Sequence, residues 1–329
     1  MSTSNAPKEI LNDAPVDHGG TGFVGAALIE RAKADSCFEI CASVRTGQQV
    51  SGVRTYQVPD LSATTSWTAA LDGVEVVIHT AARVHIMHDA SSDPLREFRE
   101  INVEGTLNLA RQAAAAGVRR FIFISSVKVN GESTEPGYAF KPDDKPNPHD
   151  PYGISKMEAE AALLPLGEQG QMDVVIIRPV LVYGPGVKGN FLSMMRWLNR
   201  GVPLPLGAIK NMRSLVGINN LVDLIVICID HPLAANQIFL VSDREDLSTT
   251  QLLTKLSIAL HKPSRLVPIP SYLIGHVAKL VGRNDIFKRL CGSLQVDTSK
   301  THELLGWTPK VSVDQGLRDT VSNFLNQGK

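Results

Sequence analysis

The chain has 329 residues and no formal net charge, because 33 Lys and Arg balance 33 Asp and Glu. Hydrophobic residues make up 43% and charged residues 20%, which is typical of soluble globular proteins and argues against disorder. The lack of a basic surplus argues against nucleic acid as a partner. No apolar run reaches the roughly 18 residues of a membrane span. The polar N-terminus and four scattered cysteines predict a cytoplasmic protein.

Short apolar runs alternate with helical patterns through the first half of the chain. The predicted strands are Glu39–Val44, Val53–Val58, Val74–His79, Arg120–Ile124 and Val174–Arg178. The predicted helices are Gly25–Lys33, Pro94–Ala116 and Gly153–Leu164. Strands that are apolar on both faces and alternate with helices are typical of a doubly wound parallel α/β sheet. We predict this domain over residues 14–178, and a smaller α/β domain over 179–329 that shares strands with the first.

A glycine-rich turn opens the first predicted helix. Gly19, Gly22 and Gly25 allow a tight turn, close approach of a pyrophosphate and close packing of helix on strand. The free N–H groups at the helix start would face the phosphates. A simple strand–helix turn is the alternative interpretation. A first strand should run directly into Gly19, but Pro15 and Asp17 suit a central strand poorly. The first strand is therefore short and distorted, or this end of the chain is unusual.

Two positions in the first domain bear on the choice of nucleotide. Arg45 ends the second predicted strand, where an acid would favour NAD and an Arg favours the extra phosphate of NADP. A solvated Arg at a strand end is the alternative. Asp60 and Leu61 follow the third strand, where a carboxylate can accept a hydrogen bond from the adenine amino group.

Tyr152 and Lys156 lie four residues apart at the start of a helical pattern and share a helix face. A phenol titrates near about 10, and a nearby ammonium is expected to lower that pKa by favouring phenolate. Ser126 follows an apolar strand, and ligands of parallel sheets lie beyond the carboxyl ends of strands. Ser126 would then bind the reacting oxygen while Tyr152 moves its proton. An exposed Tyr–Lys helix pair without function is the alternative.

These residues resemble the extended short-chain dehydrogenase/reductase family, in its nucleotide-sugar epimerase and reductase branch. The matching segments run in the family's order along most of the chain. They are Gly19–Gly25, Val77–Ala82, Asn102–Thr106, Ser126, Tyr152 with Lys156, Arg178–Pro179, Val182–Pro185, Leu305–Pro309 and Gly316–Leu317.

The resemblance implies a Rossmann fold, NAD or NADP with a slight preference for NADP from Arg45, and a C-terminal domain that binds a nucleotide sugar. It assigns catalysis to Ser126, Tyr152 and Lys156, and the sugar diphosphate to Asn190 and Arg213, with Ser126 also on the substrate side. Asn102 is expected to be structural. The cofactor positions are Gly19, Gly22, Phe23, Val24, Gly25, Arg45, Asp60, Leu61, Thr80, Ala81, Ala82, Tyr152, Lys156 and Pro179.

The implied reaction is oxidation or reduction at C4 of a UDP-sugar, by a 4-epimerase or a 4-keto-6-deoxy-sugar reductase of surface polysaccharide (O-antigen) synthesis. A 4,6-dehydratase is disfavoured because Val127 and Lys128, not acidic residues, follow Ser126. The family's usual residues are also replaced at Val216–Asn220 and at Cys291–Leu294. Two alternatives remain open: a reductase of a hydrophobic ketone of steroid or flavonoid type, and a non-catalytic dinucleotide sensor.

Two further expectations concern metals and partners. His85 and His88 are spaced like metal ligands, but no third ligand is visible, so no metal site is predicted. By analogy with family relatives, residues 94–116 and 153–164 are expected to form a four-helix interface of a homodimer.

Overall fold

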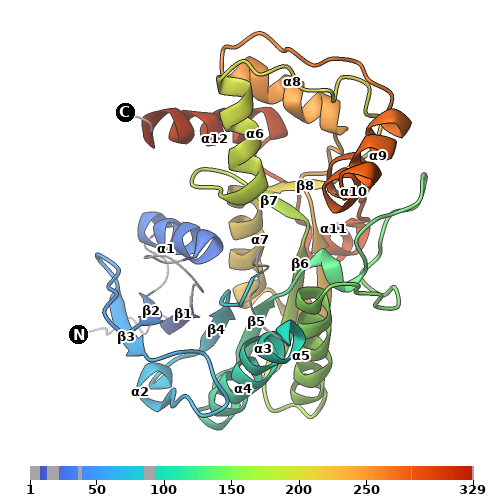
Figure 1. The fold of residues 1–329 in the computed structure, drawn as a ribbon. Coiled ribbons are helices and arrows are strands. Elements are labelled where there is room, and N and C mark those ends of the chain that lie inside the picture. Colours follow the sequence, from blue (N-terminus) through green and yellow to red (C-terminus); the bar gives the residue numbers. More distant parts are fainter. Residues whose placement is uncertain (1–7, 13–21, 36–38, 85–92, 283, 328–329) are drawn as a thin grey trace.

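The computed structural model describes residues 8–12, 22–35, 39–84, 93–282 and 284–327. Its centre is a seven-stranded sheet with the order β3-β2-β1-β4-β5-β6-β9, in which every neighbouring pair is parallel (Figure 1). This is the predicted doubly wound sheet. Its strands are β1 (Lys8–Asn12), β2 (Glu39–Arg45), β3 (Arg54–Val58), β4 (Val76–His79), β5 (Arg120–Ile124), β6 (Asp173–Pro179) and β9 (Gln237–Val241).

Helices cover both faces of the sheet (Figure 1). The alternation of side chains along β5 shows why both faces are apolar. Ile122 and Ile124 pack into the core under α1 (Phe23–Asp35) and α7 (Ile218–Asp230). Phe121 and Phe123 pack into the opposite core, under α2, α4 and α5. The helices on that side are α2 (Thr68–Leu71), α3 (Pro94–Arg99), α4 (Thr106–Ala115) and α5 (Pro151–Glu168).

The second half of the chain adds a third apolar core of its own. A short parallel pair, β7 (Leu181–Tyr183) and β8 (Leu215–Gly217), lies beside it. No helix in the described ranges is both long and apolar enough to cross a bilayer. The helices here are α6 (Gly189–Asn199), α8 (Thr249–Ala259), α9 (Ser271–Leu280), α10 (Asn284–Cys291), α11 (Ser299–Leu305) and α12 (Val313–Gln327).

The five predicted strands are confirmed with small shifts of their ends, and so are the first and third predicted helices. The second predicted helix is interrupted by a π-helical turn over Glu100–Gly105. Gly105 lies at the end of that turn and touches the backbone of Leu61, since a Cβ atom there would come within 2.9 Å of the Leu61 carbonyl oxygen. A glycine is required at this contact.

The first strand lies in a short apolar stretch of the polar N-terminus that the sequence analysis did not single out. β1 is an interior strand of the sheet, where Ile10 is in register with Cys41 of β2 and Val77 of β4. It ends at Asn12, and residues 13–21 lie outside the described part. The expectation of a strand that runs directly into Gly19 therefore stays a prediction. β1 and β9 both come from outside 14–178, so the boundaries of the two domains remain a prediction.

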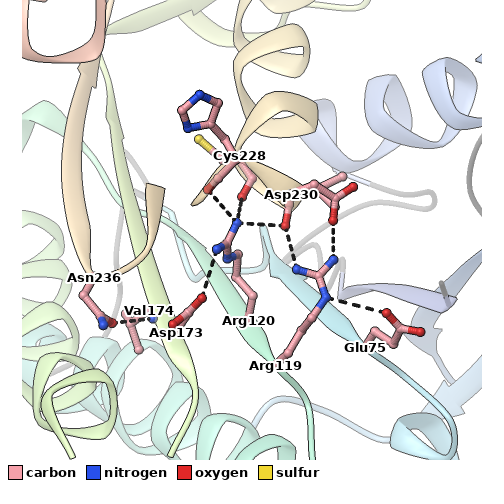
Figure 2. A network of polar contacts seen from close by, with 10 residues as sticks. Glu75, Arg119, Arg120, Asp173, Val174, Cys228, Asp230 and Asn236 are labelled. Atoms are coloured by element: carbon pink, nitrogen blue, oxygen red, sulfur yellow. Dashed lines mark hydrogen bonds and ion pairs between the residues drawn. The ribbon is translucent and has the colours of Figure 1, made fainter. Parts of the chain in front are cut away.

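Two adjacent arginines fasten the sheet to α7 at the end of the strands opposite to the carboxyl edge (Figure 2). The buried Arg120 guanidinium donates to the carbonyl oxygens of Cys228 and Ile229, at 2.8 and 2.9 Å, and to the Asp173 carboxylate at 2.9 Å. Arg119 forms an ion pair with Asp230. These cations satisfy carbonyl groups at the C-terminus of α7, where positive charge is favourable. The network is a structural clamp between the two halves.

Candidate active site

The carboxyl ends of the parallel strands bring the predicted site segments to one edge of the sheet. Thr80, Ala81 and Ala82 follow β4. Ser125 and Ser126 follow β5. The Ser126 hydroxyl accepts a hydrogen bond from the Lys128 N–H at 3.2 Å and so caps a short 3₁₀ turn. This local turn fixes Ser126 at the end of its strand.

Helix α5 carries Tyr152 and Lys156, and its start is set by Asp150. The Asp150 carboxylate accepts from the Gly153 N–H at 2.7 Å, and Pro151 occupies the first turn, as at many helix starts. Lys128 forms an ion pair with the same carboxylate. The residues after Ser126 are thus joined to the N-terminal cap of α5.

Tyr152 lies beside Ser126, as predicted. The edge of the Phe98 ring packs against the Tyr152 ring, with centroids 6.3 Å apart. Burial and the Asp150 carboxylate raise the pKa of the Tyr152 phenol, and hydrogen bonding with the Ser126 side chain opposes them. The expectation of a lowered pKa for Tyr152 is therefore wrong. At neutral pH Tyr152 is a phenol, which is the proton-donating form.

Lys156 turns its ammonium toward the end of β5. Its Nζ atom donates to the Ile124 carbonyl oxygen at 2.9 Å and lies 4.3 Å from the centroid of the Phe123 ring. The side chain is only 1% exposed, and burial lowers the pKa of Lys156 to about 7, with Glu160 acting in the opposite direction. Lys156 thus titrates near neutral pH, in contact with a carbonyl group and an aromatic face.

His79, the last residue of β4, supports this arrangement from below. Its ring stacks on Phe123 with centroids 5.7 Å apart and an interplanar angle of 20°. Its Nε2 atom is 2.9 Å from the Thr106 hydroxyl. Burial, and then the charge of Lys156, lower the pKa of His79 to about 3. A neutral His79 therefore fixes the aromatic ring on which the Lys156 ammonium rests.

The depressed pKa of Lys156 predicts an alkaline gain in stability. The unfolded chain keeps this proton up to its ordinary pKa near about 10.4, so it binds more protons than the folded chain between the two pKa values. Stability contributed by this residue is lowest below the folded pKa and rises with pH. We expect the free energy of unfolding of the wild type, relative to Lys156→Met, to increase by about 2 kcal/mol from about pH 7 to about pH 9. Urea titrations of both proteins measure it, and a difference that is flat with pH would contradict it.

A buried ion pair lies beside Ser125, the neighbour of Ser126. Arg178 and Glu160 approach to 2.6 Å, and both side chains are almost fully buried. Glu160 also accepts a hydrogen bond from Ser125, and Arg178 donates to Asn130 at 3.0 Å and to the Pro142 carbonyl oxygen at 3.1 Å. The pair thereby joins β5, α5, β6 and the loop that precedes α5. Asn102 adds a second link, from the Arg83 backbone to Ser155, which confirms its expected structural role.

The predicted cofactor positions lie mainly around the same edge. Gly22 accepts from the Ala26 N–H at 2.9 Å at the start of α1, while Gly19 lies outside the described residues. The exposed Asp60 and buried Leu61 follow β3, and buried Pro179 ends β6. Phe23 and Val24 in the first turn of α1 are half-buried, and Gly25 is buried.

Arg45 provides a direct test of whether this edge fits a dinucleotide. Its Nε atom is buried and has no hydrogen-bond partner among the described residues. A buried cationic donor without a partner is costly, and an anionic or hydroxyl-bearing ligand at the end of β2 would satisfy it. This side chain therefore fits the ribose or ribose phosphate of a nicotinamide dinucleotide.

Asn190 and Arg213, which the sequence analysis assigns to one diphosphate, differ in their exposure and in their contacts. Asn190 is exposed in the first turn of α6. Arg213 is more buried, its pKa is lowered by burial, and its Nη1 atom donates to the carbonyl oxygens of Arg289 and Gly292, each at 3.0 Å. No described hydrogen bond joins Asn190 to Arg213. Their shared role at a diphosphate remains a prediction.

Comparison with known proteins agrees with this geometry. The model of the NAD dependent epimerase/dehydratase family matches residues 18–242. The chain belongs to that family. The match supplies the class of enzyme and the class of cofactor that the site geometry fits. The Rossmann fold and the resemblance to extended short-chain dehydrogenases are thereby confirmed.

Three known proteins illustrate what this chain is similar to. A UDP-glucose 4-epimerase of Vibrio cholerae is 50% identical over 320 residues, covering 97% of this chain and 96% of the other. A GDP-6-deoxy-D-mannose reductase of Pseudomonas aeruginosa is 26% identical over 259 residues, covering 76% and 80%. The structure of a UDP-glucuronic acid 4-epimerase from Bacillus cereus with NAD has a TM-score of 0.77 at 19% identity, covering 98% and 100%.

Residues of both the departing and the matching segments have structural partners in the second half. Asn220, in a departing segment, donates to the buried Asp243 at 2.7 Å, and Tyr183, in a matching one, donates to the same carboxylate at 2.7 Å. The Trp307 indole of the C-terminal signature donates to Asp223 of α7 at 3.0 Å. These contacts tie the second half together and do not involve Ser126, Tyr152 or Lys156.

Sequence reasoning missed the supporting residues of this epimerase/dehydratase site. Asp150 before Pro151 is a recognisable helix start and could have been found from that signal. Phe98, Phe123 and Glu160 carry no local signal, because their roles depend on contacts between distant elements. The described residues contain no cluster of three or more potential metal ligands, and His85 and His88 lie outside the described ranges.

Proposed function

We propose that this protein interconverts C4 epimers of a UDP-hexose with a bound nicotinamide dinucleotide. The observation that carries the proposal is the placement of Tyr152 beside Ser126, one helical turn before Lys156, at the carboxyl edge of a dinucleotide-binding sheet. The 50% identity to a UDP-glucose 4-epimerase supports the sugar nucleotide and the epimerase reaction.

In this mechanism the nicotinamide supplies a reversible hydride acceptor. Ser126 holds the C4 oxygen by hydrogen bonding, and Tyr152 exchanges the proton of that oxygen as the carbon changes oxidation state. The phenol form of Tyr152 is ready to donate when a C4 carbonyl becomes a hydroxyl. For the oxidation step, a phenolate is needed, and positive charge near the phenol favours that form. Lys156 supplies a titratable cation one turn away, available to bind a ribose hydroxyl.

The test separates the epimerase from the 4-keto reductase of our alternative interpretation. Purified protein is incubated with UDP-glucose or UDP-galactose and a catalytic amount of NAD, and the products are resolved by chromatography. An epimerase forms the other hexose with no net production of reduced nicotinamide. Stoichiometric consumption of NADPH with a UDP-4-keto-6-deoxy-hexose, and no epimerisation, would favour the reductase. If neither sugar nucleotide is turned over but a hydrophobic ketone is reduced, the ketone-reductase alternative is favoured.

Arg45 gives a prediction on nucleotide choice. Arg45→Asp replaces the half-buried cation, whose Nε atom has no partner among the described residues, with an anion, which repels a ribose phosphate and can accept from a ribose diol. We expect NADP affinity to fall by about tenfold or more, and NAD affinity to fall less. Calorimetric titration of both nucleotides measures this. Arg54→Asp, at the opposite end of the neighbouring strand, is the matched control, and equal losses for the two nucleotides would reject a phosphate role for Arg45.

The wider setting follows from the same proposal. An enzyme of UDP-sugars works where sugar nucleotides are made, which supports the predicted cytoplasmic location and a role in surface polysaccharide synthesis. The predicted homodimer would use α3 to α5, whose outer surfaces include the exposed Arg99–Glu158 ion pair at 2.6 Å. Analytical ultracentrifugation of the whole chain tests that assembly.

A further inference from the structure

Helix α9 presents an apolar surface that no other described element covers. None of its residues is buried, and the exposed fractions of Tyr272, Val277 and Leu280 are 64%, 59% and 86%. Leu273, Val277 and Leu280 follow each other at helical spacing and therefore form one stripe. Val281 and Ile286 extend this exposed surface toward α10, which lies beside α9 (Figure 1).

The opposite side of α9 is firmly held, so its exposure does not come from a detached helix. Gly275 packs on the Phe287 ring of α10, and a Cβ atom there would lie 3.1 Å from the ring. Ile274 packs against the third core. The hairpin of α9 and α10, residues 271–291, is thus anchored by its inner side and open on its outer side.

Charge distinguishes this hairpin from the rest of the chain. Residues 261–292 contain six Lys or Arg and one Asp, a net charge of +5 in a chain whose total is zero. Lys279 and Lys288 are exposed and form no ion pair within the described structure. Exposed apolar side chains bordered by unpaired lysines are typical of helices that lie in the interface of an anionic membrane.

We propose that the α9–α10 hairpin docks this protein on an anionic lipid bilayer. Tyr272, Val277 and Leu280 enter the boundary between headgroups and acyl chains, while Lys279 and Lys288 meet lipid phosphates. A second copy of the chain fits this surface poorly, because the two paired hairpins would each carry the same net positive charge and would repel each other. The hairpin also lies next to Arg213, which is predicted to bind the sugar diphosphate. Arg213 donates to the carbonyl oxygens of Arg289 and Gly292 at the end of α10.

The test is co-sedimentation of the full chain with vesicles of phosphatidylcholine alone or mixed with phosphatidylglycerol. We expect binding to the mixed vesicles and a marked loss in high salt, because salt screens the lysine–phosphate attraction. Val277→Ser with Leu280→Ser should weaken partitioning by about tenfold or more. Lys279→Glu with Lys288→Glu should abolish it. Ile258→Ser, at an exposed position of α8 (68%), is the matched control and should bind like the wild type.

Several outcomes would overturn the proposal. They are equal binding to both vesicle types, no binding by the wild type, or a dimer that dissociates in the Val277→Ser/Leu280→Ser protein. Circular dichroism melts confirm that each variant is folded. Turnover of a soluble UDP-hexose by the Val277→Ser/Leu280→Ser protein should equal that of the wild type. Failure of membrane docking is therefore distinguishable from failure of the proposed function.

Discussion

Replacing Tyr152 by Phe is expected to lower kcat for C4 epimerisation by about a thousandfold, because the only atom removed is the one that exchanges the proton. The ring itself stays, so its edge contact with Phe98 and the start of α5 are retained. Cofactor affinity should be nearly unchanged. Steady-state kinetics with UDP-galactose and calorimetric binding of NAD measure the two effects separately.

Tyr138→Phe is the matched control for this substitution. Tyr138 is exposed and donates to Asp144 at 2.7 Å. Loss of the Tyr138 hydroxyl should leave kcat unchanged. A Tyr152→Phe protein with the wild-type kcat would exclude Tyr152 as the proton donor. A Tyr152→Phe protein that no longer binds NAD would assign Tyr152 to cofactor binding.

Removing Arg178 alone should destabilise the protein by about 3–5 kcal/mol, because Glu160 would remain charged and buried without its partner. The effect should appear in Arg178→Met as a lower midpoint of urea unfolding. The double variant Glu160→Leu with Arg178→Met removes both charges and should recover much of the loss, since buried ion pairs are often replaceable by apolar side chains of similar volume.

Exposed ion pairs give the comparison. Arg99→Met breaks the Arg99–Glu158 pair on the surface, and its cost should be less than about 1 kcal/mol, because solvent screens such pairs. If Arg178→Met and Arg99→Met were equally mild, the buried pair would have no special structural role. If the double variant were as unstable as Arg178→Met, the hydrogen bonds of Ser125 and Asn130 would account for the loss.

The elements that could be predicted from the sequence are those set by local patterns, and the elements that were missed are set by contacts between distant parts of the chain. Strand β5 is buried at every position and apolar from Phe121 to Ile124, so its existence and its bounds, Arg120–Ile124, follow from the sequence alone. β1 escapes the same reasoning because only two apolar residues mark it and its pairing with β2 and β4 is decided by partners far along the chain. β9 lies in the second half and joins the sheet beside β6, a pairing that no local pattern specifies.

The site shows the same division. The spacing of Tyr152 and Lys156 predicts a shared helix face, and Ser126 at a strand end predicts its approach to Tyr152. The protonation states depend on burial and on neighbours from other elements. Burial and Asp150 raise the pKa of Tyr152, and burial lowers that of Lys156. Such effects require the packed structure.

The edge strand β9 and helix α7 impose an order on synthesis. A nascent chain that has left the ribosome only as far as β6 exposes the unpaired edge of that strand, and the face of Ile122 and Ile124 lacks its cover of α7. Exposed strand edges and apolar faces promote aggregation. The nucleotide-binding half therefore reaches its native state only after residue 241 has emerged, and a chain truncated after Arg178 should depend on chaperones to stay in solution.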